Sequence, residues 1–259
     1  MLRKNREPMR VAFISDIHGN YTALKAVLAD LDLQNVDQIV SLGDTATLGP
    51  QPLEVMAKLE ELHCVYIKGN HDWAVLEPER ALDFQIAEHL LPDLEWCRER
   101  LTPENLEFIN TFQTSHEFSL PNGVSVLAYH GSPLSSIDLI QATTPAELLD
   151  QYFVGQTADV FIGGHSHIQM HRRNGDKLVL NAGSVGNAFT HAYSPGIVPS
   201  LLPWAEYAIL SQKDQFLDVD LRRVYFDTDE LLKIVAESDL PGAEWWLKQY
   251  QKQADKAGR

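Results

Sequence analysis

The segment Val11-Ala-Phe-Ile-Ser-Asp-Ile-His-Gly-Asn20 joins an apolar run to a short polar cluster. The run predicts a buried β-strand, and Asp16 and His18 follow at the point where that strand would end. From Tyr21 to Leu33, apolar residues recur at helical spacing, which predicts an amphipathic helix that packs on a sheet. The segment therefore predicts a β-α unit with polar side chains at the carboxyl end of its strand.

The β-α pattern repeats along the first part of the chain. Strands are predicted at 38–43 and 64–68, with a helix near 52–62 between them. Such alternation favours parallel strands joined by crossover helices, so the predicted fold class is α/β. Later strands are expected at 124–129, 159–163, 177–182, 205–211 and 216–224. We interpret the chain as one α/β domain built on two sheets.

The predicted domain covers residues 10–247. A flexible lead-in is expected at 1–9 and a frayed tail at 248–259. Residues 74–120 carry no strong strand pattern and are predicted to form a mostly helical insertion. The lead-in is basic, but no apolar segment follows it, so we do not expect it to be a secretory signal.

The composition limits the classes of function. The 259 residues carry a net charge of −15, whereas domains that bind nucleic acid through its phosphates are basic, so stable nucleic-acid binding is not expected. No apolar stretch approaches the ~18–20 residues that span a bilayer, so no membrane segment is expected. Two isolated cysteines do not suggest a disulfide framework, which favours a cytoplasmic location. The sequence leaves the oligomeric state open.

Five polar clusters each follow an apolar run. They are Asp16-Ile-His-Gly19, Gly43-Asp44, Gly69-Asn-His-Asp72, His130-Gly131 and Gly163-Gly-His-Ser-His167. Because ligands bind at the carboxyl ends of strands in an α/β sheet, we expect these clusters to meet. Carboxylates, an amide and imidazoles gathered there predict a metal site with two ions. Aspartate and histidine suit Mn²⁺, Fe, Zn²⁺ and Ni²⁺.

Each cluster taken alone also has a structural explanation. An Asp-x-His or Gly-Asp pair is common in turns that bind no metal. The clusters together are harder to explain in this way, because they contain five of the ten histidines of the chain. The remaining histidines lack this setting and are expected on the surface or in loops: His63, His89, His116, His171 and His191.

In this order, the clusters resemble the motifs of the calcineurin-like metallophosphoesterases. The resemblance spans residues 16–167 and continues through Asn181-Ala-Gly-Ser-Val-Gly186. Leu48-Gly-Pro-Gln-Pro52 and His130-Gly-Ser-Pro133 are similar to segments of a small prokaryotic subgroup, which includes proteins described as phosphodiesterases or as diadenosine-tetraphosphatase-like. The resemblance implies a two-sheet (αββα) sandwich with a dinuclear metal site at the carboxyl ends of the strands.

The resemblance also implies a role for each site residue. The first metal would be held by Asp16, His18 and His167, and the second by Asn70, His130 and His165, with Asp44 bridging both. His71 would be the acid or the phosphate-orienting imidazole and not a ligand. The implied reaction is hydrolysis of a phosphodiester, nucleotide or small phosphomonoester by a hydroxide that two divalent ions activate. Manganese is the first candidate, with Fe, Zn or Ni as alternatives.

Two other functions stay open. Serine/threonine protein phosphatases of the superfamily carry an acidic residue and an arginine where this chain has Thr47 and Leu48, and another arginine where it has Lys68. Because arginine grips a phosphate bidentately and lysine does not, a phosphoprotein substrate is less favoured. A catalytically silent scaffold of the same fold is the third possibility, although every matched position is intact.

The longest irregular stretch runs from Asn187 to Pro203 and contains Phe189, His191 and Tyr193. Loops of this length inside a compact domain are commonly functional or disordered. We hypothesise that this stretch overhangs the site as a lid and helps to select the substrate.

Overall fold

The computed structural model describes residues 9–62, 64–194, 197 and 199–257. Its strands are β1 (Met9–Ile14), β2 (Gln38–Ser41), β3 (Val65–Tyr66), β4 (Ser115–Ser119), β5 (Ser125–Tyr129), β6 (Val160–Gly163), β7 (Met170–Asn174), β8 (Lys177–Asn181), β9 (Trp204–Lys213) and β10 (Phe216–Tyr225). Its α-helices are α1 (Tyr21–Gln34), α2 (Pro52–Leu62), α3 (Asn70–Leu76), α4 (Leu91–Arg100), α5 (Pro103–Asn110), α6 (Ala146–Tyr152), α7 (Thr228–Glu237) and α8 (Ala243–Ala257).

The described strands form two five-stranded sheets. The first has the order β10-β9-β1-β2-β3, and β1, β2 and β3 pair in parallel, as the β-α-β-α-β pattern predicts. In the second, ordered β4-β5-β6-β8-β7, the central strands β5, β6 and β8 are parallel and the two edge strands are antiparallel. Each sheet therefore has a parallel centre whose carboxyl ends can present ligands.

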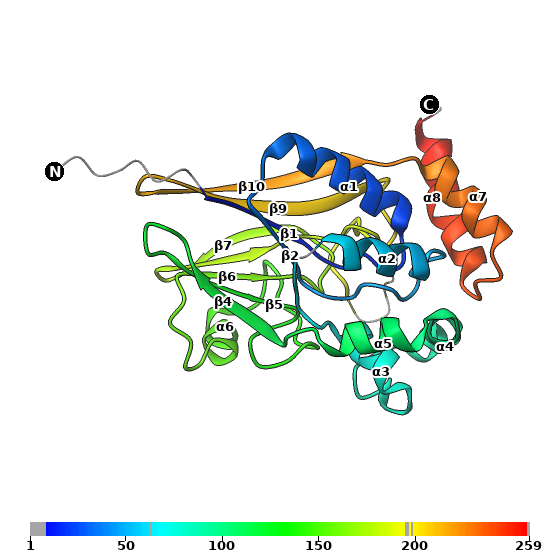
Figure 1. The fold of residues 1–259 in the computed structure, drawn as a ribbon, viewed down its shortest axis with the longest axis horizontal. Helices are drawn as coiled ribbons and strands as arrows, with labels where there is room; N and C mark the ends of the chain where they lie inside the picture. Colours follow the sequence, from blue (N-terminus) through cyan, green and yellow to red (C-terminus); the bar gives the residue numbers. More distant parts are fainter. Residues whose placement is uncertain (1–8, 63, 195–196, 198, 258–259) are drawn as a thin grey trace.

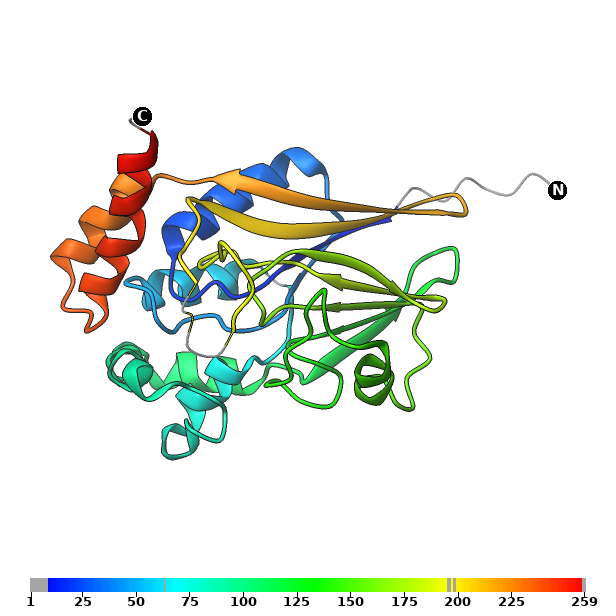
Figure 2. The same ribbon diagram turned by 180° about the vertical axis from the view of Figure 1, so that it is seen from behind.

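The two sheets pack face to face between helices (Figures 1 and 2). Alternate residues of β1 point to opposite faces, as the period of a strand requires. Val11 and Phe13 join the core between the sheets, while Ala12 and Ile14 join the core beneath the helices that include α1 and α2. On the outer face of the second sheet, α6 covers a third apolar cluster. The predicted α/β fold with two sheets in an αββα arrangement is confirmed.

The sequence pattern does not predict two of the edge strands, β4 and β7. β4 lies inside the range 74–120 that was expected to be mostly helical, and β7 lies between two predicted strands. Their sequences, Ser-His-Glu-Phe-Ser and Met-His-Arg-Arg-Asn, lack an apolar run because an edge strand buries only part of its surface. Up to Asn110 the insertion is helical, with α4 and α5 and two short 3₁₀ helices.

The C-terminal range expected to be frayed, 248–259, is helical as far as Ala257, because α8 begins at Ala243 and continues through it. Trp246 and Tyr250, four residues apart on one face of α8, are both buried and anchor this helix. Residues 1–8 of the predicted lead-in lie outside the described residues, and Met9 already begins β1. No helix in the described part of the chain combines the length and the apolar character needed to cross a membrane.

Candidate metal centre

The carboxyl ends of the parallel strands bring the polar clusters together. The side chains that follow the first sheet are Asp16 and His18 after β1, Asp44 after β2 and Asn70 after β3. Those that follow the second sheet are His130 after β5, and His165 and His167 after β6. All seven predicted ligands join one network of short contacts at this end of the sandwich.

The backbone of this site is held in an unusual conformation. Five of the seven predicted ligands have a positive φ, between 47° and 64°: Asp16, His18, Asp44, His165 and His167. Non-glycine residues rarely adopt this left-handed conformation, which costs on the order of 1–3 kcal/mol each and persists where the surroundings impose it. Here the turns fix one another, since the Asp16 amide donates to the Gly43 carbonyl and the His18 amide to the Asp44 carbonyl. Backbone strain is therefore concentrated at the predicted ligands.

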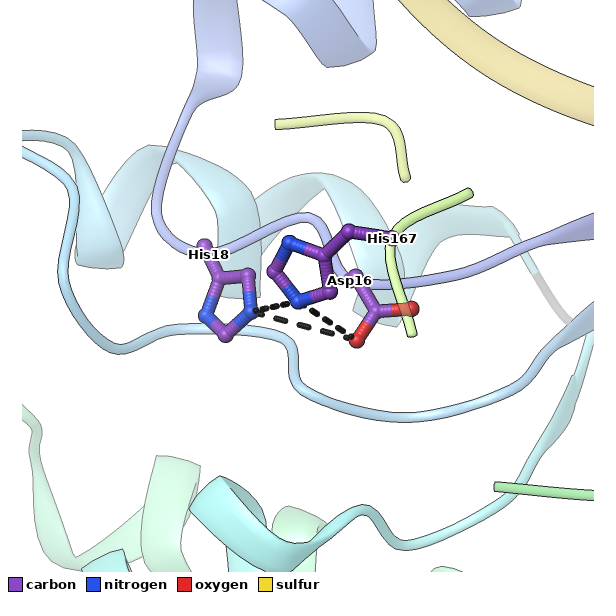
Figure 3. Close-up of side chains that lie close together, drawn as sticks. All are labelled: Asp16, His18 and His167. Carbon is purple, nitrogen blue, oxygen red and sulfur yellow. Dashed lines mark hydrogen bonds and ion pairs between the residues drawn. The ribbon is translucent and has the colours of Figure 1, made fainter. Parts of the chain in front are cut away.

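The first group of donors consists of Asp16, His18 and His167 (Figure 3). The Nε2 atoms of the two imidazoles are 3.1 Å apart, and His167 Nε2 lies 3.2 Å from Asp16 Oδ1. His18 Nε2 lies 3.9 Å from the same oxygen. Three atoms that can each offer a lone pair thus converge on one point.

The second group centres on His130. Its Nε2 atom lies 3.1 Å from Asn70 Oδ1 and 3.4 Å from Asp44 Oδ2, and His165 belongs to the same group of donors. Asp44 Oδ2 also lies 3.8 Å from His18 Nε2 in the first group. The Asp44 carboxylate therefore stands between the two groups, where a bridging ligand is expected.

Hydrogen bonds to backbone carbonyls fix the orientation of two of these imidazoles. His130 Nδ1 pairs with the Leu42 carbonyl at 2.7 Å, and His167 Nδ1 with the Asn187 carbonyl at 2.8 Å. A carbonyl only accepts, so each Nδ1 must carry the proton and each Nε2 is left to bind a metal. Among the described residues, buried Asp16 Oδ1 has no hydrogen-bond partner of adequate geometry. The donor set fits divalent cations such as Mn²⁺, Fe²⁺ and Zn²⁺.

The imidazoles and carboxylates of this cluster shift one another's pKa. Burial is the largest single influence on His130 and lowers its pKa, but the Asp44 carboxylate and its hydrogen bonds outweigh burial and raise the pKa to about 9. The pKa of His167 is raised by Asp16 in the same way, against burial. Burial and the neighbouring imidazoles lower the pKa of His18 to about 3. The raised pKa values favour the protonated forms of His130 and His167, and each imidazole must lose that proton to bind a cation.

His71 lies beside both groups of donors. Its backbone amide donates to Asp44 Oδ1 at 2.9 Å, its Nδ1 lies 3.0 Å from Thr47 Oγ1, and its ring meets that of His18 edge to face at 5.0 Å. Together with His18 and Asp44, the His71 side chain could itself form a third donor group. Its exclusion from the ligands therefore stays a prediction that the resemblance carries.

Sequence reasoning missed the role of Asp72. This buried carboxylate accepts hydrogen bonds from the backbone amides of Asp44, Thr45 and Gly69 at 2.8–3.0 Å, and from the Thr45 hydroxyl at 2.7 Å. It therefore ties the turn after β2 to the turn after β3, which carry Asp44 and Asn70. The available signal was its place at the start of a helix, where a carboxylate commonly caps the first amides.

Two further residues help to shape the site. The ring of Phe189, in the 187–203 loop, stacks on His167 with centroids 4.4 Å apart. Lys68 is buried, and its Nζ donates to the Asn110 carbonyl at 3.1 Å and lies 4.0 Å from the centre of the Trp73 ring. Two residues of the loop, Asn187 and Phe189, are thus in contact with the predicted ligand His167, while His191 and Tyr193 are exposed.

Comparison with known proteins agrees with this geometry. Residues 9–198 match the calcineurin-like phosphoesterase superfamily domain. The chain belongs to this superfamily. An uncharacterized protein of Methanocaldococcus jannaschii is 29% identical over 240 residues, which cover 91% of this chain and 94% of that protein.

Two solved structures share the fold over nearly their whole length. A metallophosphoesterase from Sphaerobacter thermophilus is 24% identical with a TM-score of 0.72, and the match covers 93% of this chain and 98% of that one. A hypothetical protein from Pyrococcus horikoshii OT3 is 19% identical with a TM-score of 0.77, and the match covers 93% and 96%. The resemblance inferred from the motifs is confirmed at the level of the superfamily and the fold.

Proposed function

We propose that this protein is a phosphoesterase that depends on two divalent metal ions and hydrolyses a phosphodiester, a nucleotide or a small phosphomonoester. The observation that supports it best is the position of Asp44. Its Oδ2 atom lies 3.8 Å from His18 Nε2 and 3.4 Å from His130 Nε2, so one carboxylate serves two groups of donors. A scaffold would have no need for two such groups in strained turns.

In this proposal the two metals divide the donors as the resemblance implies. Asp16, His18 and His167 hold one ion; Asn70, His130 and His165 hold the other; Asp44 bridges them. Manganese is the first candidate because hard carboxylate and amide oxygens are mixed with imidazoles. When bound, two such ions acidify a coordinated water and neutralise charge on the phosphate.

The chain itself supplies a donor for the leaving oxygen, the His71 side chain. If the Thr47 hydroxyl donates to His71 Nδ1, the ring keeps its proton on Nε2, which can donate to the leaving oxygen. Positioned acids of this kind typically contribute 10²–10⁴-fold. Burial lowers the pKa of His71, so at neutral pH the neutral ring acts through a hydrogen bond from its Nε2–H to the charge that develops on the leaving oxygen.

The surroundings favour a small substrate over a phosphoprotein. The lysine at the place of the protein-phosphatase arginine is already engaged by Asn110 and Trp73, as described above. Thr47 supplies a neutral hydroxyl where those phosphatases carry an acid. We further propose that the 187–203 loop contributes to substrate selection through Phe189, whose contact with His167 puts it at the site.

The test is a hydrolysis assay with added Mn²⁺, comparing bis-p-nitrophenyl phosphate with p-nitrophenyl phosphate, followed by a panel of nucleotides. We expect turnover of at least one substrate that disappears with a chelator and returns with Mn²⁺. If metals are bound but no substrate is turned over, the proposal is wrong and the scaffold function is favoured.

Two variants separate the proposed roles. Asp44→Asn should lose both bound metal and activity, because a neutral amide cannot bridge two cations in place of a carboxylate. His71→Ala should lower kcat by about 10²-fold or more while metal content, measured by elemental analysis, stays near two ions per chain. Loss of metal from His71→Ala would instead make His71 a ligand.

A further inference from the structure

The segment from Thr45 to Gly49 links the proposed bridging ligand to α2 and makes contacts on two sides. Toward the metal centre, the Thr45 hydroxyl donates to Asp72 and the Thr47 hydroxyl meets His71 Nδ1 at 3.0 Å. Away from the centre, the carbonyls of Ala46 and Leu48 accept hydrogen bonds from helices. The segment therefore connects His71 to distant parts of the chain.

Its outward contacts come from two helices that are remote in sequence. The Cys97 thiol of α4 donates to the Ala46 carbonyl at 3.4 Å, which is a weak bond. The Trp246 indole of α8 donates from Nε1 to the Leu48 carbonyl at 2.8 Å. The Trp246 bond is the stronger of the two, and the Trp246 side chain is only 1% exposed.

Leu48 needs such an anchor because its backbone is strained. Its φ is 76°, in the left-handed region that a branched apolar residue seldom occupies. Without external contacts the residue would relax toward negative φ and would move its neighbour Thr47. The bond from Trp246 holds the Leu48 carbonyl in the orientation that the left-handed conformation requires.

The C-terminal helices are themselves bonded to α4. The amide of Gly242 donates to Asp93 Oδ1 at 2.7 Å, and the Trp96 indole donates to Asp239 at 2.8 Å, so the turn between α7 and α8 is bonded to α4. Figure 1 shows α7 and α8 at the end of the molecule toward which β1 runs, and Asp16 and His18 directly follow β1 in the chain.

We propose that Trp246 is a positioning residue for His71. The indole holds Leu48, the Leu48 backbone holds Thr47, and the Thr47 hydroxyl orients the His71 ring. The C-terminal helix α8 is thus part of the catalytic apparatus although it contributes no group that touches the substrate. This inference rests on the proposed role of His71 as proton donor.

The direct test is Trp246→Phe, which keeps an aromatic ring but removes the N–H donor. We expect kcat to fall about tenfold, equivalent to about 1.4 kcal/mol in the barrier, with KM and metal content unchanged. The loss should be larger for a phenyl ester than for a p-nitrophenyl ester, because the poorer leaving group depends more on a proton donor. The matched control is Trp245→Phe, since the Trp245 indole is partly exposed on the same helix. It should leave kcat within twofold of wild type.

A double-mutant cycle separates positioning from general destabilisation. Thr47→Val removes the hydroxyl at nearly constant volume, and Thr47→Ser restores it. If Trp246 acts through Thr47, Trp246→Phe should change kcat less than twofold in the Thr47→Val background and about tenfold in the Thr47→Ser background. Equal effects in both backgrounds would mean that Trp246 acts elsewhere, and would overturn the inference.

A readout without turnover comes from the metal-free protein. The ¹⁵N shifts of the His71 ring should change in Trp246→Phe and in Thr47→Val, and stay as in wild type in Trp245→Phe. Trp246→Tyr is the second variant if the phenylalanine variant fails to fold. Should His71→Ala keep wild-type kcat, the proposed role of His71 fails; should it lose activity while Trp246→Phe and its ring shifts match wild type, only the present inference fails.

Discussion

Replacing Asp72 by alanine tests whether a single buried carboxylate holds the two turns of the metal centre together. The side chain is 1% exposed and accepts four hydrogen bonds, three of them from backbone amides at 2.8–3.0 Å. In the variant the Thr45 hydroxyl can rotate toward another acceptor, but the amides of Asp44, Thr45 and Gly69 cannot.

Each buried amide left without an acceptor costs about 1–3 kcal/mol, so three together cost about 3–9 kcal/mol. Part of this is offset because burial, and then the nearby Asp44 carboxylate, raise the pKa of Asp72 and make its charge unfavourable. We therefore expect the free energy of unfolding to fall by about 3 kcal/mol.

The assay is urea unfolding of the metal-free protein at neutral pH, in the presence of a chelator, followed by circular dichroism. Asp83→Ala is the matched control, because Asp83 is largely exposed and its loss should change stability by no more than about 0.5 kcal/mol. Asp72→Asn should lie between the two, since its amide oxygen still accepts on one side. A decrease below about 1 kcal/mol for Asp72→Ala would refute the argument that these amides depend on Asp72.

Three more predictions follow from the same centre. The pKa of His130 is raised from 6.5 to about 9, so its contribution to the stability of the metal-free protein is complete below pH 6.5 and is lost as the pH rises through 9. The pKa of His18 is lowered to about 3, so its contribution to stability is lost as the pH falls below 6.5. Metal-free stability, measured by thermal midpoint against pH, should therefore peak near 6.5, and a flat profile from pH 5 to 9 would contradict these shifts. Mn²⁺ binding at pH 7.5 should release at least about one proton per chain, because His130 must lose its proton to act as a ligand. Calorimetry in two buffers of different ionisation enthalpy measures this proton release. No release would contradict the raised pKa of His130. Gly49→Ala would place its Cβ 2.1 Å from the His18 carbonyl oxygen and should lower the free energy of unfolding by about 3 kcal/mol. The control Gly175→Ala should lower it by about 1 kcal/mol, because nothing lies within 4 Å of the added Cβ and only the backbone is strained. Equal losses would mean that the backbone around His18 yields easily.

The sequence predicted the centre of each sheet because parallel strands buried on both faces must be almost continuously apolar. Val11 to Ile14 and Val160 to Ile162 are examples, with each residue buried and each strand followed by a polar cluster. The edge strands β4 and β7 carry no such pattern, since half of an edge strand faces solvent. The helical character of residues 248–257 was missed because it depends on Trp246 and Tyr250 packing against the rest of the protein.

The identity of the candidate ligands was likewise within reach of the sequence. Polar residues directly after buried strands can only lie at the sheet edge, and parallel strands bring their carboxyl ends to the same edge. That reasoning predicts a common edge for Asp16 and Asp44, which follow neighbouring strands of one sheet; the packing of the two sheets brings His130 to the same place.

Only the tertiary structure could decide what holds those residues in place. Asp72 joins two turns that are separated by 24 residues of chain, and the Trp246 indole reaches the Leu48 carbonyl from nearly 200 residues away. Such bonds leave no periodic trace in the sequence, because they depend on where packing brings distant segments. The local pattern of apolar runs and polar ends determined which side chains gather at the centre; the packing of sheets and helices decided how their backbones are strained, oriented and held.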